Sequence, residues 1–130
     1  MTSNRVHHLP RLGISGAMQI YGVSARALRF YEERGLVEAQ RDRLNCRYYD
    51  APARQKLDWI TRLRRVNVSL PDIRHVLQAE TETDRRSRAE AIVRRRQAAL
   101  ERELDAARSL LDDLADEHEP VASVVVGAAS

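Results

Sequence analysis

The clearest pattern of apolar and polar positions lies in SARALRFYEERGL, residues 24–36. Its core-forming side chains recur at three- and four-residue intervals, which predicts a helix with one buried face. Ser24 suits the N-cap of this helix, and Gly35 suits the left-handed position just past its C-terminus. The residues expected on the buried face are Ala27, Leu28, Tyr31 and Glu32.

Two arginines of this segment are not expected on the buried face of the helix. Arg26 and Arg29 lie in the first half of the predicted helix. Cations are disfavoured near a helix N-terminus because the helix macrodipole is positive there. We therefore expect their partner to be an anion outside the protein.

Another short helix is predicted just before this one, from Leu12 to Tyr21, although Gly13 and Gly16 weaken it. Gly22 separates the two helices. Two short helices joined by a tight, glycine-containing turn form a helix-turn-helix. In such a motif the second helix is the one presented to the major groove of DNA.

The next segment, EAQRDRLNCRYYDAPA (38–53), is polar and arginine-rich and becomes β-like at CRYYD. Asn45 tolerates the positive φ that a tight hairpin turn needs. We therefore predict a short β-hairpin, or wing, with three arginines on or beside it: Arg41, Arg43 and Arg47.

Two more helices are predicted from their caps. Asp50 suits the N-cap of a helix that runs to about Arg65 and ends at Asn67. Ser69 suits the N-cap of a shorter helix that follows. The positions expected to face the core are Leu57, Ile60, either Leu63 or Arg64, Ile73, Val76 and Leu77.

Residues 84–118 contain neither proline nor glycine, and helix-forming residues dominate. Apolar side chains recur there at alternating intervals of four and three, which is typical of a coiled coil. About 35 helical residues extend roughly 50 Å, so a small domain cannot bury so long and narrow a stripe. The apolar positions of this seam are Val93, Leu100, Leu104, Ala107, Leu111 and Leu114.

The expected partner of the seam is the same helix of a second copy, in a two-fold dimer. The alternative is a helix that folds back on its own domain. Glu119 and Pro120 predict the end of the helix. Residues 119–130 then form a tail that is either disordered or packed on the dimer.

Composition excludes several classes of protein. With 43% hydrophobic and 32% charged residues, the chain resembles an ordinary soluble domain. It has no signal peptide and no apolar stretch long enough to span a bilayer, so we expect it in the cytoplasm. A single cysteine, Cys46, excludes a disulfide framework and a cysteine-rich zinc site, and no metal or cofactor is expected. Without a nucleophile–base pair or a phosphate loop, an enzyme is not expected either.

The charge is unevenly distributed. Residues 1–78 carry a net charge of +7, and residues 79–130 carry −4. A basic front half favours nucleic acid as the partner at that end. The alternative is that solvated helix faces happen to differ in charge.

Three blocks, taken in order, resemble the MerR family of bacterial transcription regulators: GVSARALRFYEERGLV (22–37), RYYD (47–50) and RLRRVNVSLPDIRHVL (62–77). The likeness covers about residues 12–78, and the long helix extends it to about residue 118. It implies a mainly α fold with a winged helix-turn-helix. The implied parts are a flexible basic arm (1–11), the DNA-binding domain (12–78), a dimerization helix forming an antiparallel coiled coil in the dimer (79–118), and the tail (119–130).

The resemblance also implies which residues meet DNA. Arg26 and Arg29 match recognition-helix positions that reach bases or nearby phosphates, and arginine can bond to both O6 and N7 of guanine. For Tyr31, core packing is the alternative, and of Tyr48 and Tyr49 one is expected to pack inward. The implied DNA-binding set is Ser24, Arg26, Arg29, Phe30, Tyr31, Arg47, Tyr49 and Arg64.

The chain departs from the family pattern at two turns. Asn45-Cys46 stands where the wing usually has glycine-tyrosine, and Asn67 replaces a common glycine. The cysteines that metal-sensing relatives place around the dimerization helix are absent, so the effector stays unassigned.

The function implied by the resemblance is that of a dimer bound to a palindromic promoter operator. The dimer distorts the DNA and so represses or activates transcription, with RNA polymerase as a further partner. Two alternatives remain: a phage excisionase-like architectural DNA binder and a coiled-coil protein-interaction module. The long helix argues against the first, and the basic front half argues against the second.

Overall fold

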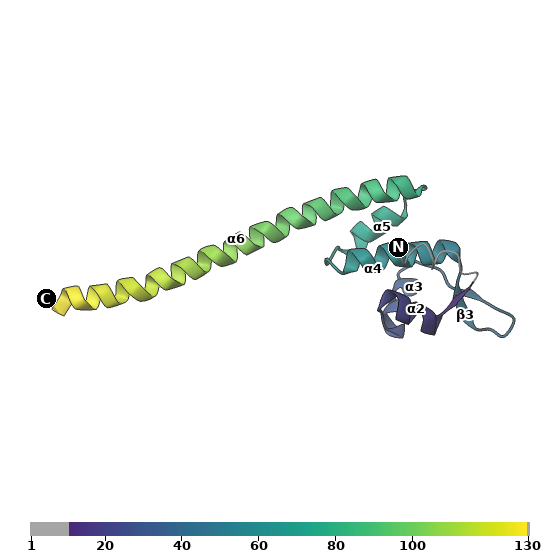
Figure 1. Ribbon diagram of the computed structural model, residues 1–130, viewed down its shortest axis with the longest axis horizontal. Helices are drawn as coiled ribbons and strands as arrows, with labels where there is room; N and C mark the ends of the chain where they lie inside the picture. The colour runs from purple at the N-terminus through teal and green to yellow at the C-terminus, as the bar shows by residue number, and fades with distance from the viewer. Residues whose placement is uncertain (1–10, 130) are drawn as a thin grey trace. The chain divides into compact units, whose positions relative to one another are not determined.

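The computed structural model describes residues 11–129, with side chains to residue 118. Most of the predicted basic arm therefore lies outside the described residues. The chain divides into two compact units, Met1–Val93 and Arg94–Ser130. The elements, in chain order, are β1 (Leu12–Gly13), α2 (Ile14–Tyr21), α3 (Ala25–Glu33), β2 (Gln40–Arg41), β3 (Arg47–Tyr49), α4 (Ala51–Arg64), α5 (Leu70–Leu77) and α6 (Glu82–Ala129) (Figure 1).

Helices α2 and α3 form the predicted helix-turn-helix. Gly22 closes α2 in the left-handed region at φ 65°. The Ser24 hydroxyl caps α3 by accepting a 3.0 Å hydrogen bond from the Ala27 amide, and Gly35 follows α3 at φ 72°. The predicted start of α2 was two residues early, because Leu12 and Gly13 pair with β3 as a strand. Strand pairing depends on distant residues, which local propensity does not report.

The predicted wing is confirmed as part of a three-stranded antiparallel sheet with the order β1-β3-β2. Tyr49 pairs with Leu12 of β1, and Tyr48 pairs with Gln40 of β2. Asn45 adopts φ 63° in the turn between β2 and β3, as predicted. Figure 1 shows this hairpin extending away from helices α2, α3 and α4.

Helices α4 and α5 begin at the predicted caps. The Asp50 carboxylate accepts from the Ala53 amide at 3.1 Å, and the Ser69 hydroxyl accepts from the Asp72 amide at 3.3 Å. Asn67 takes φ 58° between the helices, the left-handed conformation that asparagine tolerates.

The core of the first unit gathers the predicted apolar faces. Leu28, Leu57, Ile60, Ile73 and Val76 are fully buried, and Leu63 is the buried member of the Leu63–Arg64 alternative. The first turns of α6 add Ala89 and Ile92 to the same core. For this reason the first compact unit continues to Val93 rather than ending with α5.

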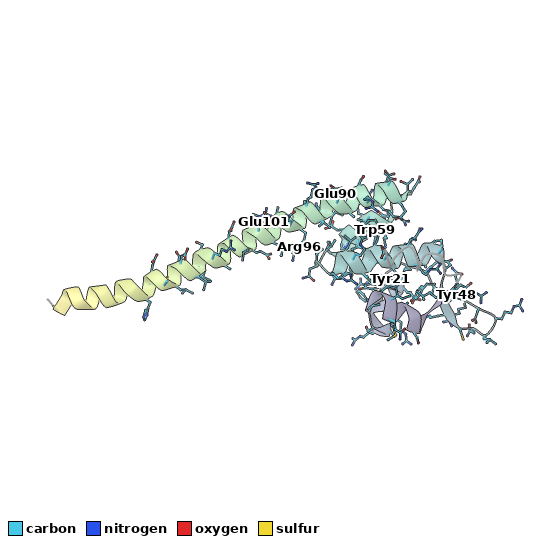
Figure 2. The ribbon with its side chains drawn as sticks, viewed as in Figure 1. Tyr21, Tyr48, Trp59, Glu90, Arg96 and Glu101 are labelled. Atoms are coloured by element: carbon cyan, nitrogen blue, oxygen red, sulfur yellow. The ribbon has the colours of Figure 1, made fainter. Side chains whose placement is uncertain are left out.

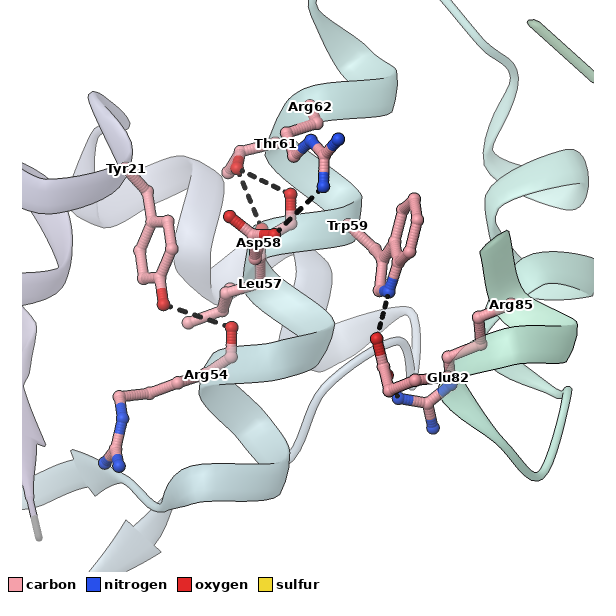
Figure 3. A network of polar contacts seen from close by, with 9 residues as sticks. All are labelled: Tyr21, Arg54, Leu57, Asp58, Trp59, Thr61, Arg62, Glu82 and Arg85. Atoms are coloured by element: carbon pink, nitrogen blue, oxygen red, sulfur yellow. Dashed lines mark hydrogen bonds and ion pairs between the residues drawn. The ribbon is translucent and has the colours of Figure 1, made fainter. Parts of the chain in front are cut away.

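Polar side chains join α6 to this core. The Trp59 indole Nε1 donates to Glu82 Oε2 at 3.1 Å, and Arg85 Nη1 lies 2.8 Å from Glu82 Oε1 (Figure 3). Arg88 Nη1 donates to the His75 carbonyl of α5 at 2.7 Å. The start of α6 is therefore fixed to both α4 and α5.

In the second unit, Arg94–Ser130, the helical backbone of α6 continues to Ala129. It passes Pro120, so the end of the helix predicted there is wrong; the φ of proline is compatible with a helix, although proline lacks the backbone donor and crowds the preceding turn. The sequence left two alternatives for residues 119–130, a disordered tail or a tail packed on the dimer. The side chains of these residues lie outside the described ones. None of the described helices combines the length and the hydropathy that a membrane-spanning segment requires.

Candidate nucleic-acid interface

A groove of about 450 Å³ lies between recognition helix α3 and the wing. Arginines dominate its lining, although two carboxylates take part. Arg29 and Arg47, both predicted from the sequence to bind DNA, lie in it together. The lining residues are Arg29, Glu32, Glu33, Arg41 and Arg47.

Glu32 connects the recognition helix to the wing. Its Oε2 accepts a 2.8 Å hydrogen bond from the Tyr49 hydroxyl, and its Oε1 lies 3.6 Å from Arg47 Nη2. Burial and the hydrogen bond to the Glu32 carboxylate raise the pKa of Tyr49 above its usual range. The Tyr49 hydroxyl therefore stays protonated and donates to Glu32 at neutral pH.

Tyr49 is buried, so the structure does not favour its predicted role as a phosphate contact. The residue is 0% exposed, because strand β3 turns alternate side chains to opposite faces and Tyr49 takes the inner one. Tyr48, which is labelled in Figure 2, takes the other face and is half-buried. The Arg11 guanidinium lies 4.9 Å from the Tyr48 ring centroid. The sequence predicted that one of the pair packs inward, without saying which.

The outer face of α3 carries Arg26, Arg29 and Phe30, all exposed as predicted. The Arg34 guanidinium lies 5.1 Å from the Phe30 ring centroid, a cation–π contact. Tyr31 is only 8% exposed and belongs to the core, which was the alternative to its predicted approach to DNA. The outward cations of α3 are therefore the two that the sequence pattern singled out.

The remaining two predicted contacts also serve the fold. Ser24 is exposed at the N-terminus of α3, where its hydroxyl acts as the cap. Arg64 is exposed, and its Nη1 donates to the Val68 carbonyl at 2.9 Å across the turn before α5. Its other guanidinium donors can meet a phosphate while this bond persists.

A buried arginine of α4, which the sequence analysis missed, stabilises strand β3 of the wing. Arg54 of α4 is 1% exposed, and its Nη1 donates to the Tyr49 carbonyl at 2.9 Å. The Tyr21 hydroxyl donates to the Arg54 carbonyl at 3.0 Å (Figure 3). Burial, with a smaller effect of the Asp58 carboxylate, raises the pKa of Tyr21 to about 12. The only sequence signal was the place of Arg54 beside Ala53 and Leu57, on the apolar side of α4.

The predicted dimerization seam lies on one side of α6. Its six positions, which the sequence predicted to contact a second copy, are exposed within the single chain: Val93, Leu100, Leu104, Ala107, Leu111 and Leu114. No group of three histidine, cysteine or acidic side chains that could hold a metal ion occurs among the described residues.

The recognition helix with outward arginines and the arginine-bearing hairpin beside it define a winged helix-turn-helix protein of the DNA-binding class. The family model described as "MerR HTH family regulatory protein" matches residues 13–80, more than half of the chain. The chain belongs to the MerR family of transcription regulators.

Solved structures of regulators are similar to this chain. HiNmlR, described as a MerR family regulator lacking the sensor domain, was solved bound to promoter DNA. It is 28% identical over 73% of this chain and 79% of its own, with a TM-score of 0.51. PbrR691 from Ralstonia metallidurans CH34, solved with lead(II), is 27% identical over 81% and 83%, with a TM-score of 0.59. A MerR family regulator from Listeria monocytogenes is 27% identical over 79% and 80%, with a TM-score of 0.55. No curated protein sequence matches the chain.

Proposed function

We propose that the protein regulates transcription by binding a specific palindromic operator within a promoter. The groove that joins Arg29 of α3 to Arg41 and Arg47 of the wing carries this proposal. A row of guanidinium groups beside an exposed recognition helix suits a helix in the major groove with phosphates along its flank. HiNmlR, described as lacking a sensor domain and solved with promoter DNA, gives further support.

The same proposal includes a homodimer with α6 as an antiparallel coiled coil. The seam exposes large apolar side chains, among them Leu111 at 67%. Covering this seam with the same seam of a second copy removes apolar surface from water and places two recognition helices on one duplex. On these grounds we assign residues 12–78 as the DNA-binding domain and residues 79–118 as the dimerization helix.

Regulation in this proposal depends on distortion of the promoter, which lets RNA polymerase use it or prevents polymerase from doing so. Bending or untwisting a site costs several kcal/mol, and contacts from two wings can offset that cost. Because the substrate is chromosomal DNA, we place the protein in the bacterial cytoplasm.

Footprinting of the purified protein on the DNA upstream of its own gene, at several salt concentrations, tests the proposal. The expected result is protection of a short palindrome with affinity about a thousandfold above that for competitor DNA. Weak binding that is indifferent to sequence would contradict promoter regulation and support an architectural DNA binder. A complete lack of binding would support a protein-interaction module.

A further inference from the structure

The tip of the wing exposes a large apolar side chain. Leu44 is 84% exposed, the highest exposure among the large hydrophobic residues described. It lies between Arg43 and Asn45 in the turn that joins β2 to β3. Among the described residues of the first unit, the hydrophobic core closes without the Leu44 side chain.

The turn that carries Leu44 is held in one conformation. Asp42 Oδ1 accepts hydrogen bonds from the amides of Leu44 and Cys46, both at 2.9 Å. Two backbone hydrogen bonds of 3.0 Å also close the turn. The Asp42 amide donates to the Cys46 carbonyl, and the Asn45 amide donates to the Asp42 carbonyl. Arg41 Nη1 donates to the Asn45 carbonyl at 2.9 Å. A preorganised tip loses little conformational entropy when it binds.

These hydrogen bonds also lower the free-energy cost of removing the tip from water. A buried backbone amide or carbonyl without a partner is costly, and this turn satisfies several of its own groups from within. The exposed side chains of the tip include one large apolar group, Leu44, and the cation beside it, Arg43, followed by the smaller Asn45 and Cys46. This surface suits a partner that is anionic at its edges and apolar between them.

The minor groove of DNA has those properties. Phosphates line its edges, and the faces of the stacked bases become accessible where a step opens. The wing extends away from α2, α3 and α4 (Figure 1). With α3 in the major groove, the next groove along the duplex is the minor one, about 6 Å wide and too narrow for a helix.

We propose that Leu44 enters the minor groove beside the operator and separates a base step there, while Arg43 approaches the adjacent phosphates. This inference rests on the proposed function and gives that function a source of DNA distortion. Apolar side chains that insert at a base step kink DNA toward the major groove.

The test compares Leu44→Ser with Leu44→Met on the operator fragment. The DNA carries 2-aminopurine at steps on either side of the palindrome, and its bend is measured by circular-permutation gel shift. We expect wild type and Leu44→Met to raise the 2-aminopurine fluorescence at one flanking step and to bend the DNA. Leu44→Ser should lose both effects and bind about tenfold more weakly.

Matched variants separate the wedge from general effects. Leu110→Ser removes an equally large exposed side chain from α6 and should leave bend and fluorescence unchanged. Arg43→Ala should lower the salt dependence of binding by about one unit per subunit while part of the bend remains. Because Leu44 lies outside the core, thermal melts of its variants should overlay that of wild type.

Three results would overturn the inference. The first is a Leu44→Ser variant that bends DNA as wild type does. The second is a Leu44→Met variant that fails as completely as Leu44→Ser. The third is a Leu44→Ser variant that binds and bends DNA normally yet loses transcription in a reconstituted assay, which would assign the tip to RNA polymerase. If wild type does not bind the operator at all, the proposed function falls together with this inference, whereas the other three results leave that function standing.

Discussion

Arg29 and Arg47 line the same groove with different surroundings. Arg47 is half-buried and lies beside the Glu32 carboxylate, while Arg29 is exposed on α3, with no ion pair shown among the described side chains. A phosphate that approaches Arg47 shares the guanidinium with Glu32, whereas Arg29 offers all its donors. At this scale the chemistry of the interface depends on the neighbours of each arginine.

Replacing either arginine tests this difference. Arg29→Ala and Arg47→Ala should both weaken operator binding and leave the dimer intact, with the larger loss for Arg29→Ala. For Arg47→Ala the plot of log affinity against log salt should become shallower by about one unit per subunit. Arg108→Ala, which removes the same charge from the exposed surface of α6, is the control. An equal loss of affinity in this control would contradict a local contact.

Tyr21 should make stability depend on alkaline pH. An unfolded tyrosine ionises near pH 10, whereas burial holds the pKa of folded Tyr21 at about 12. Between these values the unfolded chain has lost a proton that the folded chain keeps, so the free energy of unfolding falls as pH rises. Tyr21→Phe should be about 1 kcal/mol less stable at neutral pH, because it loses the hydrogen bond to Arg54.

Urea denaturation at a series of pH values from 8 to about 11.5 measures both effects. The stability of Tyr21→Phe should decline less steeply than that of wild type above pH 10. Parallel declines would show that another group causes the alkaline loss.

At the scale of elements, local chemistry explains what the sequence predicted. The caps at Ser24, Asp50 and Ser69 and the positive φ of Asn45 depend on residues only a few positions away. The inward face of Tyr49 depends instead on strand register, because a shift of one residue exchanges the faces.

Contacts between distant elements escaped prediction for the same reason. Glu32 meets Tyr49 across 17 positions, and Trp59 meets Glu82 across 23. No local sequence pattern indicates such pairs. Arg54 is likewise expected at the surface from its residue type, whereas the fold buries it. The exposure of Arg26, Arg29 and Phe30 on one face of α3 was therefore predictable, while the polar connections between α3 and the wing were not.

Gly35 tests the boundary of the recognition helix. Its φ of 72° lies in the left-handed region, where a Cβ costs about 1 kcal/mol or more. Space is not the obstacle, since a Cβ there would meet only Arg74 Nη1 at 3.8 Å. Gly35→Ala should therefore lower the free energy of unfolding by about 1 kcal/mol, measured by urea denaturation.

Gly13→Ala is the matched control, because Gly13 has φ −72° and open space around its Cβ position. Because Gly13 is also the N-cap of α2, where alanine is less favourable than glycine, this variant should lose about 0.5 kcal/mol of stability, less than Gly35→Ala. A loss of stability as large as that of Gly35→Ala would contradict the argument from φ.

At the scale of the whole molecule, the prediction concerns the seam of α6. Leu104→Glu places a charge in the apolar seam, where its burial against a second copy is costly. The variant should sediment as a monomer, and the near-ultraviolet signal of Trp59 should show that the first unit remains folded. Its affinity for the operator should fall by about a hundredfold or more, because two linked sites become one.

Ser109→Glu adds the same charge on the opposite side of α6 and serves as the control. It should remain dimeric and bind the operator as wild type does. A dimer of Leu104→Glu, or equal dissociation of both variants, would argue against this seam as the interface.

The open seam of α6 has a consequence for the cell. In the proposed dimer, a second copy covers this surface, which couples assembly to abundance. While subunits are scarce, the number of pairs grows with the square of the amount synthesised, so occupancy of a promoter rises more steeply than expression. For the proposed dimer, a modest change in gene dosage or in proteolysis should then produce a disproportionate transcriptional response.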